Sequence, residues 1–97
     1  MSLNIIYPTH DGARFDMRYY RETHIPLVMK VLNPVGVILI EGVPMGGEPA
    51  PYVLIAHFEF ASTEAMNAAL ANPARAELRA DVAAFTDIKP IVILGKQ

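Results

Sequence analysis

The sequence predicts one α+β domain in which an antiparallel sheet packs against helices, and three observations support this class. Apolar, β-branched runs of strand length occur four times along the chain, at 3–7, 35–41, 52–60 and 88–94. The two long segments between these runs carry apolar residues at helical spacing. The chain has 97 residues, the length of a single domain (1–97) with a small core.

The first half is expected to contain a strand, a long helix and a second strand. The strand at 3–7 ends at a proline. The helix is expected over 15–33, and the second strand over 35–41. Pro26 lies inside the helix, where it is expected to kink or break it, because proline donates no backbone hydrogen bond and leaves the carbonyl of Glu22 free.

The second half repeats this order. The run 52–60 alternates most clearly as a strand. Ser62 can cap the N-terminus of a second helix. Asn72 precedes a proline and looks like another helix cap, so this helix is either two pieces or one bent piece that ends near Phe85. The last strand is expected over 88–94. The resulting β-α-β-β-α-β order is the ferredoxin-like plan, a four-stranded antiparallel sheet with helices on one face.

Both faces of the predicted sheet are apolar. Alternate residues of the second strand place Val37 and Leu39 on one face and Ile38 and Ile40 on the other. Two helices cover only one face, so we expect a second copy of the chain to cover the other, sheet against sheet, as a dimeric α+β barrel. The alternative is that strand propensity alone fills these positions with valine and isoleucine.

The first helix carries polar groups on its inward stripe. Tyr20 and His24 share a helical face with Leu27, Val28 and Val31. A histidine and a tyrosine on a core-facing stripe are costly to bury unless they form hydrogen bonds or line a cavity. This segment is therefore the first place to look for chemistry.

The same segment resembles a known family. The pattern Phe15-Asp16-x-x-Tyr19-Tyr20-x-x-Thr23-His24-x-Pro26-Leu27-Val28 is similar to that of the EthD family, within the dimeric α/β-barrel superfamily. That family takes its name from a gene needed for bacterial degradation of ethyl tert-butyl ether. Relatives in the superfamily include cofactor-free monooxygenases, muconolactone isomerase, polyketide cyclases and haem-degrading enzymes. The resemblance implies the fold and a homodimer, and it places His24 on the family's motif.

His24 and Tyr20 are the candidate catalytic residues. A neutral imidazole at the wall of an apolar pocket can move protons near neutral pH without a cofactor. Tyr20, one turn earlier, can orient the imidazole or hold a substrate oxygen. Two alternatives remain open for His24: it bonds the carbonyl freed by Pro26 and pins the kink, or it is an axial haem ligand.

Tyr19, His57 and Glu59 are the candidate substrate-binding residues. Tyr19 lies about 100° around the helix from Tyr20, and packing at the edge of the sheet is its alternative role. His57 and Glu59 share one face of the third strand, where they form either an acid–base pair or a hydrogen-bond network at the dimer interface. The histidines and Glu59 do not have the spacing of a metal site, so we expect no metal and no cofactor.

Composition and charge exclude several further classes of function and partner. The net charge is −2, and the basic residues do not cluster along the chain, which argues against a nucleic-acid or anionic membrane surface. The absence of cysteine excludes disulfides and thiol nucleophiles. The first residues show no signal-peptide pattern, and no apolar run approaches the about 20 residues of a membrane span. We therefore expect a cytoplasmic protein with no nucleic-acid or membrane partner.

Three functions compete at this point. The first is a small enzyme that binds a hydrophobic, aromatic or carbonyl compound and catalyses isomerisation, cyclisation or cofactor-free oxygenation through proton transfer. The second is a non-catalytic ligand-binding or accessory dimer in ether or xenobiotic degradation. The third is an RNA-recognition module, which shares the element order, but the third strand has an acid and lacks the glycines that such modules need.

Overall fold

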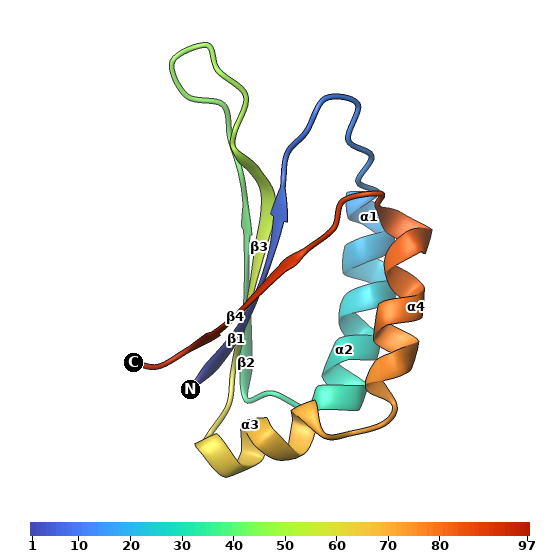
Figure 1. Cartoon of the computed structure of the whole chain (residues 1–97), viewed down its shortest axis with the longest axis vertical. Coiled ribbons are helices and arrows are strands. Elements are labelled where there is room, and N and C mark those ends of the chain that lie inside the picture. The colour runs from blue at the N-terminus through green and yellow to red at the C-terminus, as the bar shows by residue number, and fades with distance from the viewer.

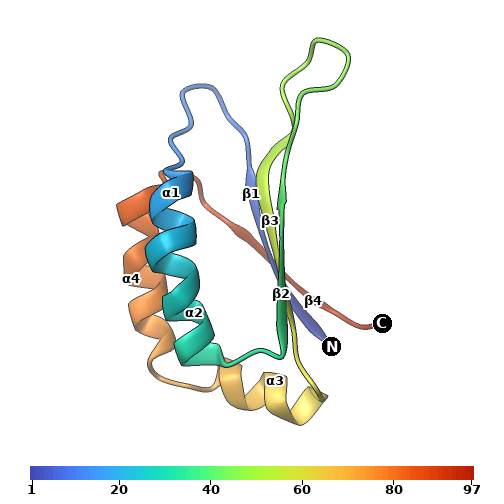
Figure 2. The ribbon, with the colours of Figure 1, turned by 180° about the vertical axis from the view of Figure 1, so that it is seen from behind.

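A four-stranded sheet forms one layer and a pair of long helical segments forms the other in the computed structural model, which describes all 97 residues (Figure 1). The elements in chain order are β1 Ser2–Pro8, α1 Met17–Tyr19, η1 Tyr20–His24, α2 Ile25–Leu32, β2 Gly36–Glu41, β3 Tyr52–Glu59, α3 Thr63–Leu70, α4 Arg75–Phe85 and β4 Ile91–Gly95. Seen from behind, α2 and α4 lie side by side over the same face of the sheet, and α3 lies at one end of it (Figure 2).

The sheet has the order β2-β3-β1-β4, with every neighbouring pair antiparallel. The two central strands are β1 and β3, which pair so that Leu3 lies opposite Phe58 and Tyr7 opposite Leu54. This is the α+β, ferredoxin-like arrangement that the element order predicts. The first half of the chain and the second half each contribute one central and one edge strand, so the helix that follows each central strand packs against the same sheet face.

The first helix differs from the expected kinked helix. Its α1, η1 and α2 segments follow one another without interruption, and η1 is a turn of π-helix. Within it, the N–H of Ile25 bonds the carbonyl of Tyr20, five residues back. Pro26 therefore falls in the first turn of α2, where a missing N–H is tolerated. The helix ends at Asn33, which adopts a left-handed conformation with φ 50°.

The second helical region is two pieces, which resolves the alternatives left by the sequence. Ser62 caps α3 by accepting a hydrogen bond from the N–H of Ala65 at 3.0 Å. The chain then turns at Asn72, whose side-chain oxygen accepts from the N–H of Ala74 and whose amide donates to the carbonyl of Val31. That second bond ties the start of α4 to the end of α2.

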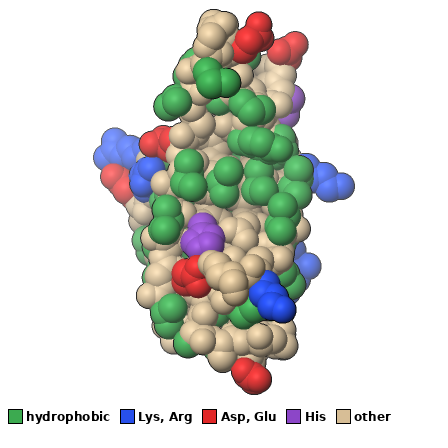
Figure 3. Space-filling model, turned by 90° about the vertical axis from the view of Figure 1, so that its left-hand side faces the viewer, with side chains coloured by type: hydrophobic (Ala, Val, Ile, Leu, Met, Phe, Trp, Pro, Cys, Tyr) green, Lys and Arg blue, Asp and Glu red, His purple; other side chains and the backbone are tan.

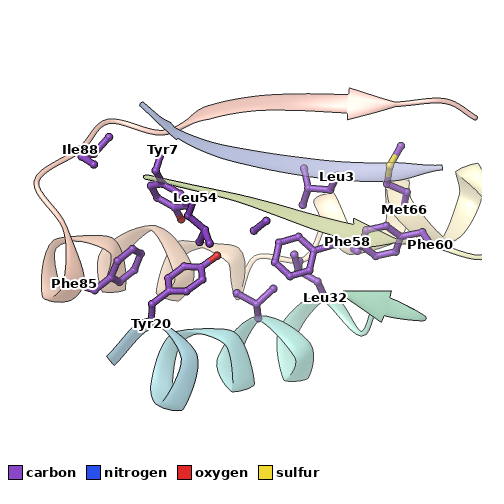
Figure 4. Packing of buried hydrophobic residues seen from close by; sticks show 13 residues of the cluster. Leu3, Tyr7, Tyr20, Leu32, Leu54, Phe58, Phe60, Met66, Phe85 and Ile88 are labelled. Carbon is purple, nitrogen blue, oxygen red and sulfur yellow. The ribbon is translucent and has the colours of Figure 1, made fainter. Parts of the chain in front are cut away.

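Aromatic rings fill the core between the sheet and the helices (Figure 4). Phe85, at the end of α4, is fully buried. Its ring centroid lies 5.0 Å from that of Tyr20, 4.6 Å from that of His24 and 5.9 Å from that of Tyr7. The end of α4 is thereby held against η1 and β1 at one point, and the candidate site residues sit beside it.

The opposite face of the sheet has no helix over it, and we call it the open face. Figure 3 looks onto this face and shows hydrophobic side chains spread across it. The most exposed isoleucines are Ile38 at 57%, Ile40 at 51%, Ile93 at 48% and Ile91 at 46%. The alternation of the strands places these side chains, and the open face is the second apolar face that the sequence predicts. In the helices, no segment has both the length and the hydropathy to cross a membrane.

Candidate functional site

The inward line of the first helix runs through Tyr20, His24, Val28 and Leu32. Tyr20 is 1% exposed and His24 is 5% exposed, so both polar rings lie in the core. Leu27 and Val31, which the helical wheel places on this stripe, flank the line and are only half-buried. The four-residue spacing of the buried line puts each of its members over the sheet.

A pocket of about 390 Å³ opens beside this line, between the helix layer and the sheet. Its walls come from β1, α2, α4 and the segment that leads into β4. Tyr20 and His24 line it together with apolar side chains that include Leu3, Val28 and Val82. The volume lies at the lower end of the range for small-molecule sites. The pocket therefore lies under the first helix, on the sheet face away from the open face.

Asp81 fixes the imidazole of His24. Nδ1 of His24 donates to Oδ2 of Asp81 at 2.9 Å, and the hydroxyl of Tyr19 donates to the other carboxylate oxygen at 2.7 Å. The His24 side chain is 6% exposed and that of Asp81 is 18% exposed. Nε2 of His24 has no hydrogen-bond partner in the protein, and no polar side-chain atom without a partner is fully buried, so this nitrogen keeps some accessible surface in a ring that lines the pocket.

The environment sets the charge of this group of side chains. Burial lowers the pKa of His24, and the hydrogen bond and charge of Asp81 offset this only in part. Burial acts to raise the pKa of Asp81, but hydrogen bonds from Tyr19 and His24 together bring it below its usual value. The hydrogen bond to Asp81 also raises the pKa of Tyr19. At neutral pH the arrangement is a carboxylate beside a neutral imidazole whose free nitrogen can accept a proton.

Tyr20 packs against one face of the His24 imidazole. Its ring stacks on that of His24 with centroids 5.3 Å apart and an angle of 25° between the planes. Figure 4 shows Tyr20 reaching from the helix toward the sheet, where it meets Tyr7 with ring centroids 5.8 Å apart. Burial raises the pKa of Tyr20 and raises that of Tyr7 to about 12. Both phenols therefore stay protonated across the physiological range.

Tyr19 does not line the pocket. Its ring stacks on Phe85 with centroids 6.4 Å apart, and its hydroxyl bonds Asp81. The structure places Tyr19 behind the His24–Asp81 pair, where it acts on the carboxylate.

The structure places His57 and Glu59 on the open face, so the sheet separates them from His24. Nδ1 of His57 lies 2.7 Å from the side-chain oxygen of Asn4, and Nε2 lies 2.8 Å from Oε1 of Glu59. Both ring nitrogens of His57 thus have a hydrogen-bond partner, and Gln97 donates to the same carboxylate oxygen of Glu59. The hydrogen bond from His57 lowers the pKa of Glu59. These groups form a closed polar network at the edge of an apolar surface.

The sequence reasoning missed Asp81, although a signal was available. Asp81 lies three residues after Leu78 and four before Phe85, on the inward side of α4. An acid among these apolar positions faces the core and needs a hydrogen-bond donor there. Its partner lies 57 residues earlier in the chain, so sequence spacing alone gives no indication of which donor it meets.

The fold and the site define a small α+β protein with an apolar pocket and a buried histidine–carboxylate pair. The sequence matches the EthD domain family over residues 12–89, which includes Tyr20, His24 and Asp81. The chain belongs to the EthD family. A comparison with curated protein sequences gives no match.

Three solved structures are similar to this chain. An EthD-like protein from Ralstonia eutropha JMP134 is 31% identical, with a TM-score of 0.87 over 98% of this chain and 88% of that one. An EthD family protein from Bacillus halodurans C-125 is 15% identical, with a TM-score of 0.70 over 98% and 97% of the two chains. A protein from Arabidopsis thaliana is 17% identical, with a TM-score of 0.65 over 99% and 95%. The last two share the fold.

Proposed function

We propose that this protein binds a small hydrophobic, aromatic or carbonyl compound in the pocket and that His24 transfers a proton on it without a cofactor. One observation carries the proposal: Asp81 holds Nδ1 of a buried histidine that lines an apolar pocket, and Nε2 of the same ring has no partner in the protein. Asp81 fixes both the tautomer and the direction of the ring. A histidine held only for packing does not need a free basic nitrogen at a pocket wall.

The chemistry follows from these positions. Nε2 of His24 accepts a proton from a carbon next to a carbonyl, and the electron pair moves onto the carbonyl oxygen as an enolate. The imidazolium that forms lies beside the Asp81 carboxylate, which stabilises it. Tyr20 is the donor that we assign to the enolate oxygen. Return of the proton to a different carbon completes an isomerisation. Attack of the enolate carbon on a second carbonyl of the same molecule, whose oxygen takes the proton back from His24, completes a cyclisation.

The test does not require knowledge of the natural substrate. Apolar ketones and aldehydes are incubated with the protein in D₂O, and incorporation of deuterium beside the carbonyl is followed by NMR. His24→Asn is the informative variant, because the asparagine amide occupies the place of Nδ1 and can still donate to Asp81 while the basic nitrogen is gone. We expect exchange to fall by about 10²–10⁴-fold in this variant.

Thr23→Ala is the matched control, since Thr23 is an exposed neighbour on the same turn. It should leave exchange unchanged. Exchange that persists in His24→Asn would refute the role of His24. Binding of the compounds without exchange in the wild-type protein would instead support a non-catalytic binding protein, a role compatible with the ethyl tert-butyl ether name that the Bacillus relative carries.

We also propose that two copies pair through the open face. The exposed Ile38, Ile40, Ile91 and Ile93 form an apolar surface that no element of the chain covers. Burial of apolar surface contributes roughly 25 cal/mol per Å², so covering this face would stabilise the pair. A two-fold arrangement brings the same surface of each copy together and places the network around His57 and Glu59 at its edge. The pairing proposal rests on the sequence and the open face, and the proposed cytoplasmic location rests on the sequence alone.

A further inference from the structure

Three cations surround the pocket. Arg75 and Arg79 lie one turn apart on α4, and Lys89 lies in the segment that leads into β4. All three line the pocket, and Arg79 and Lys89 are exposed at its mouth. The three come from two separate parts of the chain, so helix periodicity alone does not bring them together.

These cations have no acidic partner in the protein. Arg18 pairs with Glu22 and Arg21 with Glu41, but none of the ion pairs in the structure includes Arg75, Arg79 or Lys89. The pocket lining contains no aspartate or glutamate. A chain of net charge −2 thus presents three positive groups, and no negative one, around its apolar pocket.

Arg75, one of the three cations, is held in place by a hydrogen bond. Nη1 of Arg75 donates to the carbonyl of Leu70 at 2.7 Å, which ties the guanidinium to the end of α3 and leaves its other N–H groups free. The side chains of Arg79 and Lys89 form no hydrogen bond and no ion pair within the protein. A guanidinium with free N–H groups and two free cations on the lining of the same pocket suit an anion with two or more oxygen acceptors.

We infer that the ligand is a hydrophobic carboxylate whose apolar body lies against Leu3, Val28 and Val82 and whose anionic end is held by Arg75, Arg79 and Lys89. This inference deepens the proposed function and rests on it, because it takes the pocket to be the ligand site. It also sets the orientation of the bound ligand: the apolar body extends inward toward His24, and the charged end stays near solvent. Anionic aromatic and aliphatic acids fit this description, and neutral ethers and hydrocarbons do not.

The test uses two probes that differ only in charge. Isothermal titration measures the affinity of 3-phenylpropionate and of its neutral amide, 3-phenylpropanamide, for the wild-type protein, Arg79→Gln/Lys89→Gln and Arg18→Gln. Arg18 is the matched control because it is an exposed cation that pairs with Glu22 away from the pocket. Arg79 and Lys89 are exposed, so their replacement leaves the core intact, and a urea unfolding curve checks this.

We expect the carboxylate to bind the wild-type protein at least about tenfold more tightly than the amide, a preference worth about 1.4 kcal/mol. The preference should shrink in added salt and fall to a small remainder in Arg79→Gln/Lys89→Gln, where only Arg75 is left, while the amide affinity stays the same and Arg18→Gln behaves as wild type. Equal binding of the two probes by the wild-type protein would overturn the inference and leave the apolar pocket of the proposed function standing. Binding of neither probe would count against the inference and the proposed function together.

Discussion

Replacing His24 with asparagine should flatten the dependence of stability on pH between about pH 7.5 and about pH 5.5. Two effects compete at His24: burial disfavours the imidazolium, and the carboxylate of Asp81 favours it. Burial is the larger effect, so the pKa of His24 in the folded protein lies below its ordinary value of 6.5. Below pH 6.5 the unfolded chain therefore takes up a proton that the folded protein resists, and the free energy of unfolding falls as the solution becomes more acidic.

The size of the effect has a definite upper limit. If His24 stays neutral in the folded protein, protonation of the unfolded chain one unit below 6.5 lowers the free energy of unfolding by about 1.4 kcal/mol, against less than about 0.1 kcal/mol one unit above it. Asp81 does not contribute in this range. Its pKa is lowered from 3.8, so the stability that it confers is present above that value and is lost only as the pH falls further.

Urea unfolding at the two pH values measures the difference, with linear extrapolation to water. The wild-type protein should lose up to about 1.4 kcal/mol more than His24→Asn on acidification. The asparagine keeps a donor for Asp81, so a stranded carboxylate does not obscure the comparison. Equal losses in the two proteins would mean that His24 keeps its ordinary pKa when folded, and a smaller loss in wild type would mean that Asp81 outweighs burial. The first result would refute the dominance of burial, although an imidazole with the ordinary pKa of 6.5 is still mostly neutral at neutral pH; the second would remove the neutral base from the proposed mechanism.

Three further predictions concern other parts of the molecule. Asp81→Asn should lower the deuterium exchange rate, because the amide can offer its N–H to Nδ1 of His24 and place the imidazole proton on Nε2; an unchanged rate would show that Asp81 does not set the tautomer. Ser62→Ala should lower the free energy of unfolding by about 1 kcal/mol through loss of the α3 cap, and a urea midpoint equal to wild type would contradict this. Ile40→Glu places a charge on the open face and should convert a dimer to a monomer in light scattering; a wild-type protein that is itself monomeric would rule out the proposed pairing.

The strands and the cap of α3 were predictable from the sequence because their signals are local, whereas the expectation that Asn72 caps the next helix is wrong, since α4 begins at Arg75 with Ala74 as its cap residue and no side-chain capping bond. The alternation of β3 assigns its side chains to two faces without knowledge of its neighbours, and it separates Phe58 from His57 correctly. Ser62 caps α3 through a residue only three positions away. The position of the site on the first helix was also predictable, because a polar ring on a core-facing stripe is costly to bury in any fold.

The partners of these residues were not predictable in the same way. Asp81 contacts His24 only because α4 packs beside η1. Arg75, Arg79 and Lys89 line one pocket only because the segment that leads into β4 and α4 both form its wall. The π-helical turn was missed for a different reason. A proline inside a helix is compatible with a kink, a break or a wider turn, and the choice depends on which hydrogen bonds the packed helix retains.

That wider turn makes this stretch tolerant of a change in chain length. A π-helical turn closes its hydrogen bonds over one residue more than an α-helical turn does. Removal of the exposed Glu22 can therefore be absorbed by return to α-helical geometry, with α2 still seated on the sheet and Pro26 still in its first turn. The deletion would turn Tyr20 and the residues before it relative to His24 without opening the core around Leu32. Loss of a single residue here would therefore change which side chain stacks on His24, a position that Tyr20 now holds.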